Sequence, residues 1–189
     1  MSAEWRIEKP IGTIPNILLM EKNELNLFAG DISRAYGNVR ILIHPFYREN
    51  MEPDPYDQAR QYSHSNLVRD SLINCDLPSL IFEDPDSVDS TNLRVQFSSR
   101  KNCTYFVTTK HDNPTPTIPG LHITDEQAWE YLLNQLHLAG VKKCELGGRE
   151  LYHLSNGRAG GCVLVAYERL CEKFNTRLIG NLCYPDNII

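Results

Sequence analysis

The stretch Val39-Arg-Ile-Leu-Ile-His44 is a nearly continuous apolar run, and Pro45 follows it directly. A run of this kind is typical of a strand in a parallel sheet that is covered on both faces. We therefore predict a first strand that begins at Val39 and has its carboxyl end at His44. Further strands are predicted downstream, over residues 79–84, 104–109, 141–146 and 176–182.

Helical patterns separate most of these strands. The first helix opens at Asp54-Pro55, a residue pair suited to a helix start, and it ends before Pro78. The clearest helix opens at Thr124, which has a capping-box partner three residues later, and it closes at Gly140. A last helix begins at Cys162. The alternation predicts a three-layer, doubly wound α/β fold with a mostly parallel sheet and right-handed crossovers.

Three segments do not follow this alternation. Two apolar stretches within residues 14–28 flank Glu21-Lys-Asn-Glu24 and predict an N-terminal strand or hairpin. Residues 1–38 are accordingly expected to pack as an extension on a single α/β domain over 39–189. Residues 85–102 are compatible with a loop containing an irregular helix or an extra strand. The prolines at 114, 116 and 119 predict a surface excursion.

Length, composition and charge restrict the class of protein. The 189 residues suffice for one substantial core, and a net charge of −5 without a basic stripe argues against nucleic-acid binding. No apolar run is long enough to cross a bilayer, and the N-terminus lacks the pattern of a secretory signal. We therefore expect no membrane association and a cytoplasmic location, in which the six dispersed cysteines stay reduced and largely buried.

Known cofactor and metal motifs are missing from the sequence. It contains no P-loop and no dinucleotide fingerprint, so we expect no nucleotide cofactor. His44, His111 and His153 lack the close spacing of metal ligands, so we also expect no metal. A small-molecule ligand is the expected partner, and the oligomeric state stays open, a homo-oligomer included.

Polar side chains follow the predicted strands at the point where each strand ends. In open α/β sheets, ligands bind at the carboxyl ends of the strands. The candidate residues for binding or chemistry at this rim are His44, Glu83, Lys110, His111 and Arg149. Strands end in polar loops in every sheet of this type, so each residue is equally compatible with an ordinary loop position.

The loop Ser155-Asn-Gly-Arg-Ala-Gly-Gly-Cys162 leads directly into the last helix. A thiol at a helix N-terminus lies near the positive end of the helix dipole, which favours the thiolate, and Arg158 would act in the same direction. The N–H groups near Gly160 and Gly161, together with Arg158, would equally form a cradle for an anion. In a third interpretation, Cys162 is a small buried residue under a tightly packed helix.

The C-terminal half resembles the isochorismatase-like cysteine hydrolases. The resemblance is carried by a helix, a strand closing on glycine, a second helix that begins Cys-Val, and a final strand, which here are residues 129–140, 141–148, 161–163 and 177–180. It implies a cysteine nucleophile at Cys162 and a lysine at Lys110. The family's aspartate at the end of the first strand corresponds in position to His44, and the loop between Gly148 and Gly161 is longer than in the family.

The resemblance implies hydrolysis of a small amide or related acyl bond. Cys162 would attack, His44 would serve as the base, and Lys110 would steady the developing charge. N–H groups near Gly161 would form the oxyanion site. The alternatives are a non-enzymatic protein that binds an anionic metabolite on residues 155–162, a protein that assembles with a partner, and a purely structural subunit.

Overall fold

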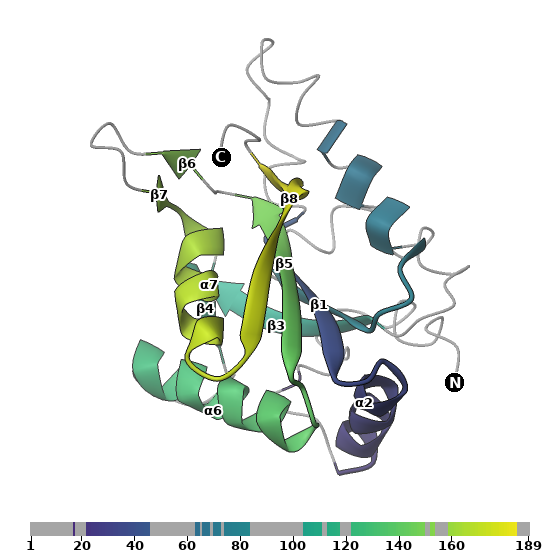
Figure 1. Ribbon diagram of the computed structural model, residues 1–189. Helices are drawn as coiled ribbons and strands as arrows, with labels where there is room; N and C mark the ends of the chain where they lie inside the picture. Colours follow the sequence, from purple (N-terminus) through teal and green to yellow (C-terminus); the bar gives the residue numbers. More distant parts are fainter. Residues whose placement is uncertain are drawn as a thin grey trace.

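The computed structural model describes residues 17, 22–45, 63–64, 66–68, 70–72, 74–83, 104–110, 113–117, 122–149, 152–153 and 159–184. Its main sheet has six strands in the spatial order β4-β3-β2-β1-β5-β8 (Figure 1). The strands are β1 (Asn38–Ile43), β2 (Ser79–Glu83), β3 (Thr104–Lys110), β4 (Asn113–Pro116), β5 (Lys143–Arg149) and β8 (Asn175–Tyr184). Neighbouring strands are parallel except for the antiparallel pair β3 and β4. The expected α/β class with a mostly parallel sheet is confirmed.

The direction of the chain across the sheet reverses at β1. Strands β2 and β3 follow β1 on one side, whereas β5 and β8 lie on the other side. Such a reversal creates a topological switch point between β1 and β5, which is where open sheets of this type bind ligands. At this point a Cβ atom on Gly148 would lie only 2.1 Å from the carbonyl oxygen of Ile43, and φ of Gly148 is 137°. The end of β5 therefore requires glycine in order to pack against β1.

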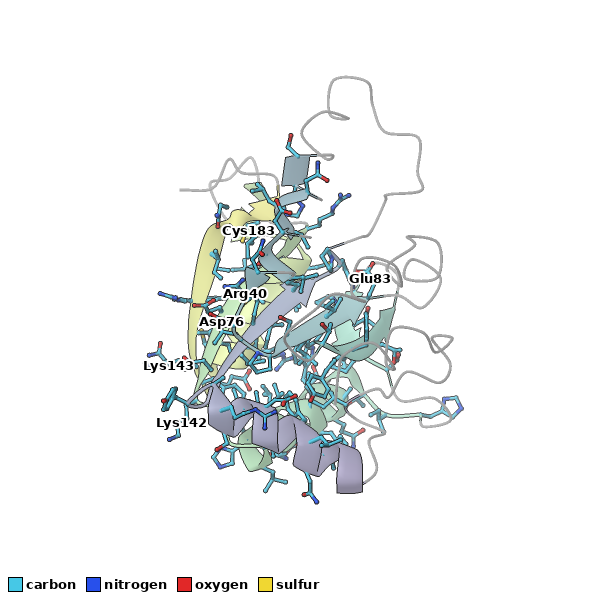
Figure 2. The ribbon with its side chains drawn as sticks, turned by 90° about the vertical axis from the view of Figure 1, so that its right-hand side faces the viewer. Arg40, Asp76, Glu83, Lys142, Lys143 and Cys183 are labelled. Atoms are coloured by element: carbon cyan, nitrogen blue, oxygen red, sulfur yellow. The ribbon has the colours of Figure 1, made fainter. Side chains whose placement is uncertain are left out.

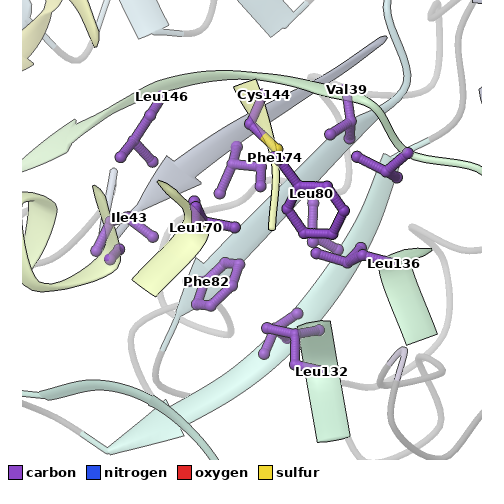
Figure 3. Packing of buried hydrophobic residues seen from close by; sticks show 14 of the residues in the cluster. Val39, Ile43, Leu80, Phe82, Leu132, Leu136, Cys144, Leu146, Leu170 and Phe174 are labelled. Atoms are coloured by element: carbon purple, nitrogen blue, oxygen red, sulfur yellow. The ribbon is translucent and has the colours of Figure 1, made fainter. Parts of the chain in front are cut away.

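Three helices of the described part of the chain cover one face of the sheet. They are α2 (Lys22–Arg34), α6 (Asp125–Leu138) and α7 (Cys162–Cys171). Phe28 packs edge-on against Tyr105 of β3, and the ring of Phe82 stacks on Trp129 of α6. Figure 3 shows part of the resulting hydrophobic cluster, in which side chains from the strands meet those of the helices. Burial of this apolar surface is the main source of stability for the fold.

The opposite face carries the helical residues 63–64, 66–68, 70–72 and 74, which Figure 1 shows away from α6 and α7. Arg40 of β1 points to this side, where its Nη1 donates to the Ser71 hydroxyl at 2.6 Å. Its Nη2 pairs with Glu145 of β5 at 2.7 Å, and Arg177 of β8 also donates to Glu145. Burial would raise the pKa of Glu145, but these hydrogen bonds hold it below its usual value. The cluster thus joins three strands and the covering segment.

The N-terminal segment differs from the predicted strand or hairpin. From residue 22 onward it is the helix α2, and residues 14–16 and 18–21 lie outside the described part of the chain. Leu25, Phe28 and Ile32 recur at helical spacing, and the last two are fully buried. The charged residues that we interpreted as a turn include the start of α2, so the hairpin prediction is wrong over this range.

The proline-rich stretch also differs from its prediction. Residues 113–116 form β4 and pair with β3, and Pro114 and Pro116 are buried. Proline is tolerated at a sheet edge because an outer amide has no ladder partner there. Pro119, the predicted helix start at 54–55 and the segment 85–102 lie outside the described residues.

The helices α6 and α7 begin where the sequence predicts. The Thr124 hydroxyl accepts from the Gln127 N–H while the Gln127 side chain accepts from the Thr124 N–H, so the capping box is confirmed. A short antiparallel pair, β6 (Tyr152–His153) and β7 (Ala159–Gly160), precedes α7. No helix in the described part of the chain is long and apolar enough to cross a membrane.

Candidate functional site

Cys162 is the first residue of α7. Its N-cap is Gly161, which has φ 99° and no side chain to cap the first N–H groups of the helix. Both α7 and α6 run antiparallel to the strands, so their N-termini lie at the carboxyl edge of the sheet. Cys162 is only 5% exposed. The predicted position of this thiol at a helix N-terminus is confirmed, and the thiol lies below the surface.

A pocket of about 420 Å³ opens beside Cys162. Its walls come from β4, the start of α6 and the first two turns of α7, and its described lining is Asn113, Pro114, Thr115, Asp125, Glu126, Trp129, Gly161, Cys162, Val165 and Arg169. Arg169 Nη2 lies 3.5 Å from Glu126 Oε1, so an ion pair connects the two helices at this pocket. Asn113 Nδ2 donates to Asp125 Oδ2 at 3.4 Å. The pocket therefore combines one thiol, two carboxylates, one guanidinium and an apolar wall.

His44 follows β1 at the switch point. It is buried and has φ 44°, which is in the left-handed region that few non-glycine residues adopt. Its Nε2 lies 3.0 Å from the hydroxyl oxygen of Thr109, which is also buried. Either the hydroxyl donates to Nε2 or the Nε2–H donates to the hydroxyl, depending on the tautomer. This contact ties the end of β1 to the end of β3, although β2 lies between them.

The other candidate residues are distributed along the same rim. Lys110 is the last residue of β3, and Arg149, which is buried, is the last residue of β5. Glu83 is buried at the end of β2; because Phe82 faces the helix-covered cluster, strand alternation directs Glu83 to the opposite face. Gly160 ends β7. The structure therefore places Glu83 away from the pocket beside Cys162, and two further candidates, Arg158 and His111, lie outside the described residues.

Only Cys162 and Gly161 among the predicted site residues belong to the described pocket lining. His44 is at the same edge of the sheet but is absent from that described lining. The pocket walls, above all Trp129 and Arg169, were not among the predicted site residues. The antiparallel course of α6 relative to the strands could have placed its first turn there, whereas nothing in the sequence indicated that β4 would form a wall.

The other described cysteines differ from Cys162 in their surroundings. Burial raises the pKa of Cys144 to about 12, although a hydrogen bond with Thr176 acts in the opposite direction. Cys171, at the other end of α7, is exposed.

Within the described ranges, no group of three or more His, Cys, Asp or Glu side chains is arranged to hold a metal ion.

Comparison with known proteins gives limited similarity. No protein-family model matches this chain, and no curated protein matches it. Among solved structures, the chain is similar to the MAR1 ribonuclease from Caenorhabditis elegans, with a TM-score of 0.44 and 17% identity. The match covers 79% of this chain and 68% of the ribonuclease chain. The likeness is weak and distant, and it does not establish a common fold or a common activity.

Proposed function

We propose that the protein is a cysteine-dependent hydrolase of a small amide or related acyl substrate, with Cys162 as the nucleophile. The observation that carries the proposal is the position of Cys162, which begins α7 and lines a pocket of about 420 Å³ at the carboxyl edge of the sheet. A helix N-terminus favours the thiolate, and a pocket of this size suits a small molecule. The resemblance of residues 161–163 to the isochorismatase-like hydrolases supports the same chemistry.

The reaction has two stages. The Cys162 sulfur bonds to the substrate carbonyl carbon, while the thiol proton passes to His44 and the carbonyl electron pair moves to oxygen. The oxyanion then collapses, the bond to the amine nitrogen breaks, and the amine leaves with the proton from His44. In the second stage water gives a proton to His44 and attacks the thioester. The carbon–sulfur bond breaks, the thiol regains its proton, and the carboxylic acid departs.

N–H groups at the start of α7 would stabilise the oxyanion in both stages. Gly161 has no side chain that competes for the first N–H groups of the helix. Donors of this kind are effective because they are oriented before the charge develops. In this proposal Lys110 acts on the same developing charge or on a substrate carboxylate.

His44 is the proposed base, and Thr109 is its positioning residue. The proposal requires His44 to reach the Cys162 thiol directly or through one water molecule. The contact of Nε2 with the Thr109 hydroxyl would fix the orientation of the imidazole ring that carries the proton in this proposal. The left-handed backbone of His44 supports this role, because strained residues concentrate at functional sites.

Cysteine alkylation as a function of pH tests the nucleophile. We expect Cys162 to react with iodoacetamide with an apparent pKa below about 8.5, the value of an ordinary thiol. Cys171 is the exposed control, and Cys144, with a pKa of about 12, should react only after unfolding. Peptide mass spectrometry separates the three sites. A Cys162 that is protected like Cys144 would contradict the hydrolase and leave the anion-binding alternative, which phosphate titration tests.

Variants test the base and its positioning residue. We expect His44→Gln to lower hydrolysis of the best amide substrate by about 10²- to 10⁴-fold and to raise the apparent pKa of Cys162. Thr109→Val should shift the pH profile, whereas Thr109→Ser, which keeps the hydroxyl, should restore it. If His44→Gln changes neither the rate nor the pH dependence of alkylation, His44 is not the base.

A further inference from the structure

Two exposed turns lie side by side at the amino end of the sheet, opposite to the pocket. One connects α2 to β1, and the other connects α6 to β5. The Gly37 carbonyl accepts hydrogen bonds from the Lys142 N–H at 2.8 Å and the Lys143 N–H at 3.1 Å. A Cβ atom on Gly37 would lie 3.1 Å from the Gly140 carbonyl oxygen. The two turns therefore form one continuous surface.

Tyr36 of the first turn has an energetically unfavourable backbone conformation. Its φ is 55°, in the left-handed region that glycine adopts most easily, yet its side chain is 88% exposed. The equivalent position in the second turn is Gly140, with φ 88°. A ring so exposed gains little from packing within this chain, so the fold does not compensate for the strain.

Leu138 is the second exposed apolar residue of this surface. It is the last residue of α6 and is 77% exposed. An isolated exposed leucine is ordinary. Here, however, it precedes the turn that contacts the turn of Tyr36. A large aromatic side chain and an aliphatic one are thus presented to solvent on two connected turns.

The second turn leads directly into two lysines. Lys142 and Lys143 are exposed, and neither forms an ion pair with a described residue. Figure 2 shows both lysine side chains projecting beside the end of α2. The whole chain carries a net charge of −5. Two adjacent lysines without an ion pair among the described residues are thus part of the same two connected turns as Tyr36 and Leu138.

We propose that Tyr36, Leu138, Lys142 and Lys143, the turn patch, dock an acidic segment of a partner protein. An apolar side chain of the partner contacts Tyr36 and Leu138, and flanking carboxylates pair with the two lysines. Exposed aromatic anchors bordered by charge are typical of protein recognition. The inference does not depend on the proposed hydrolase.

A protein segment fits the turn patch better than other anionic partners. Nucleic-acid binding depends on many phosphate contacts, and two lysines provide few of them. Attachment to an anionic membrane takes clusters of about four to eight basic residues. Tyr36 offers a stacking surface for a single base, whereas Leu138 offers a contact only for an apolar side chain.

Binding of a designed peptide to the full chain tests the proposal. The probe is a labelled 12-residue peptide of Glu and Asp with a central Leu-Phe pair, and its control replaces every acid by Gln or Asn. We expect saturable binding of the acidic peptide but not of its control, measured by fluorescence anisotropy. The affinity should fall as the salt concentration rises. Equal binding of the two peptides, or no saturable binding of the acidic one, would overturn the proposal.

Variants locate the binding surface. The double variant Lys142→Glu, Lys143→Glu should lower the affinity for the acidic peptide at least about tenfold. Tyr36→Gly should lower this affinity several-fold while the fold is retained. The matched control is Tyr131→Ala, which removes an exposed aromatic of α6 outside the turn patch and should leave binding unchanged. Stronger competition by a single-stranded oligonucleotide or by anionic vesicles than by unlabelled peptide would also refute a protein partner.

Discussion

The turns that end α2 and α6 have the same hydrogen bonds but different residues at the left-handed position. In the first, Tyr36 N–H donates to the Ser33 carbonyl at 3.0 Å and Gly37 N–H to that of Ile32 at 2.9 Å. In the second, the Gly140 N–H donates to the His137 carbonyl at 2.9 Å and the Val141 N–H to that of Leu136 at 3.0 Å. Both are Schellman motifs, in which glycine is the usual left-handed residue. The difference shows that the hydrogen bonds of this motif form with either residue at the left-handed position.

The largest effect is expected from Gly37→Ala, which alters the contact between the two turns. Gly37 has φ 81°, and a new Cβ would press on the Gly140 carbonyl oxygen and on Lys142 Cγ at 3.0 Å. The left-handed backbone and the crowding together should lower the free energy of unfolding by about 3 kcal/mol. Urea unfolding followed by circular dichroism measures this free energy. A decrease in the free energy of unfolding of less than about 1 kcal/mol would mean that the turns are not closely packed.

Gly140→Ala isolates the backbone contribution in the α6 turn. No atom lies within 4 Å of a Cβ built at this glycine, so crowding adds nothing. The left-handed conformation alone should cost about 1 to 2 kcal/mol. The same unfolding measurement applies, with the exposed substitution Glu130→Ala on α6 as the control for an ordinary surface change. A neutral Gly140→Ala would remove the basis for regarding Tyr36 as strained.

The smallest effect has the opposite sign. Tyr36→Gly relieves the left-handed strain, and the greater flexibility of glycine in the unfolded chain offsets part of this gain. We expect the free energy of unfolding to rise by about 1 kcal/mol. Tyr36→Ala keeps the strained backbone without the ring, so it should not stabilise. If the glycine variant is less stable than the native protein, the tyrosine ring contributes to the fold and the comparison fails.

Much of the sheet follows from local sequence patterns, and the two errors have physical causes. The apolar runs that became β1, β2 and β3 were predicted because buried strands need no polar face. The helix α2 was missed because its charged start separates two apolar stretches and so looks like a turn. The strand β4 was missed because Pro114 and Pro116 disfavour strand pairing locally, whereas the edge of β3 provides a partner that only tertiary structure reveals.

The candidate site was predictable only in part. The position of Cys162 at a helix start follows from the glycines that precede it, and the rim position of His44 follows from the end of its strand. The pairing of His44 with Thr109 depends on strand order, since β2 intervenes between their strands. The pocket walls come from elements distant in sequence, so local reasoning could not assemble them.

The two prolines of β4 also affect how molecules of this protein would aggregate. Open strand edges are templates for intermolecular pairing, and proline blocks such pairing because it lacks an amide donor. Among the described strands, β4 forms one edge and contains Pro114 and Pro116, while the opposite edge is β8, ten residues long and without proline. Under heat or crowding, edge-to-edge aggregation should therefore begin at β8. Lysine or proline substitutions that improve solubility belong on that strand.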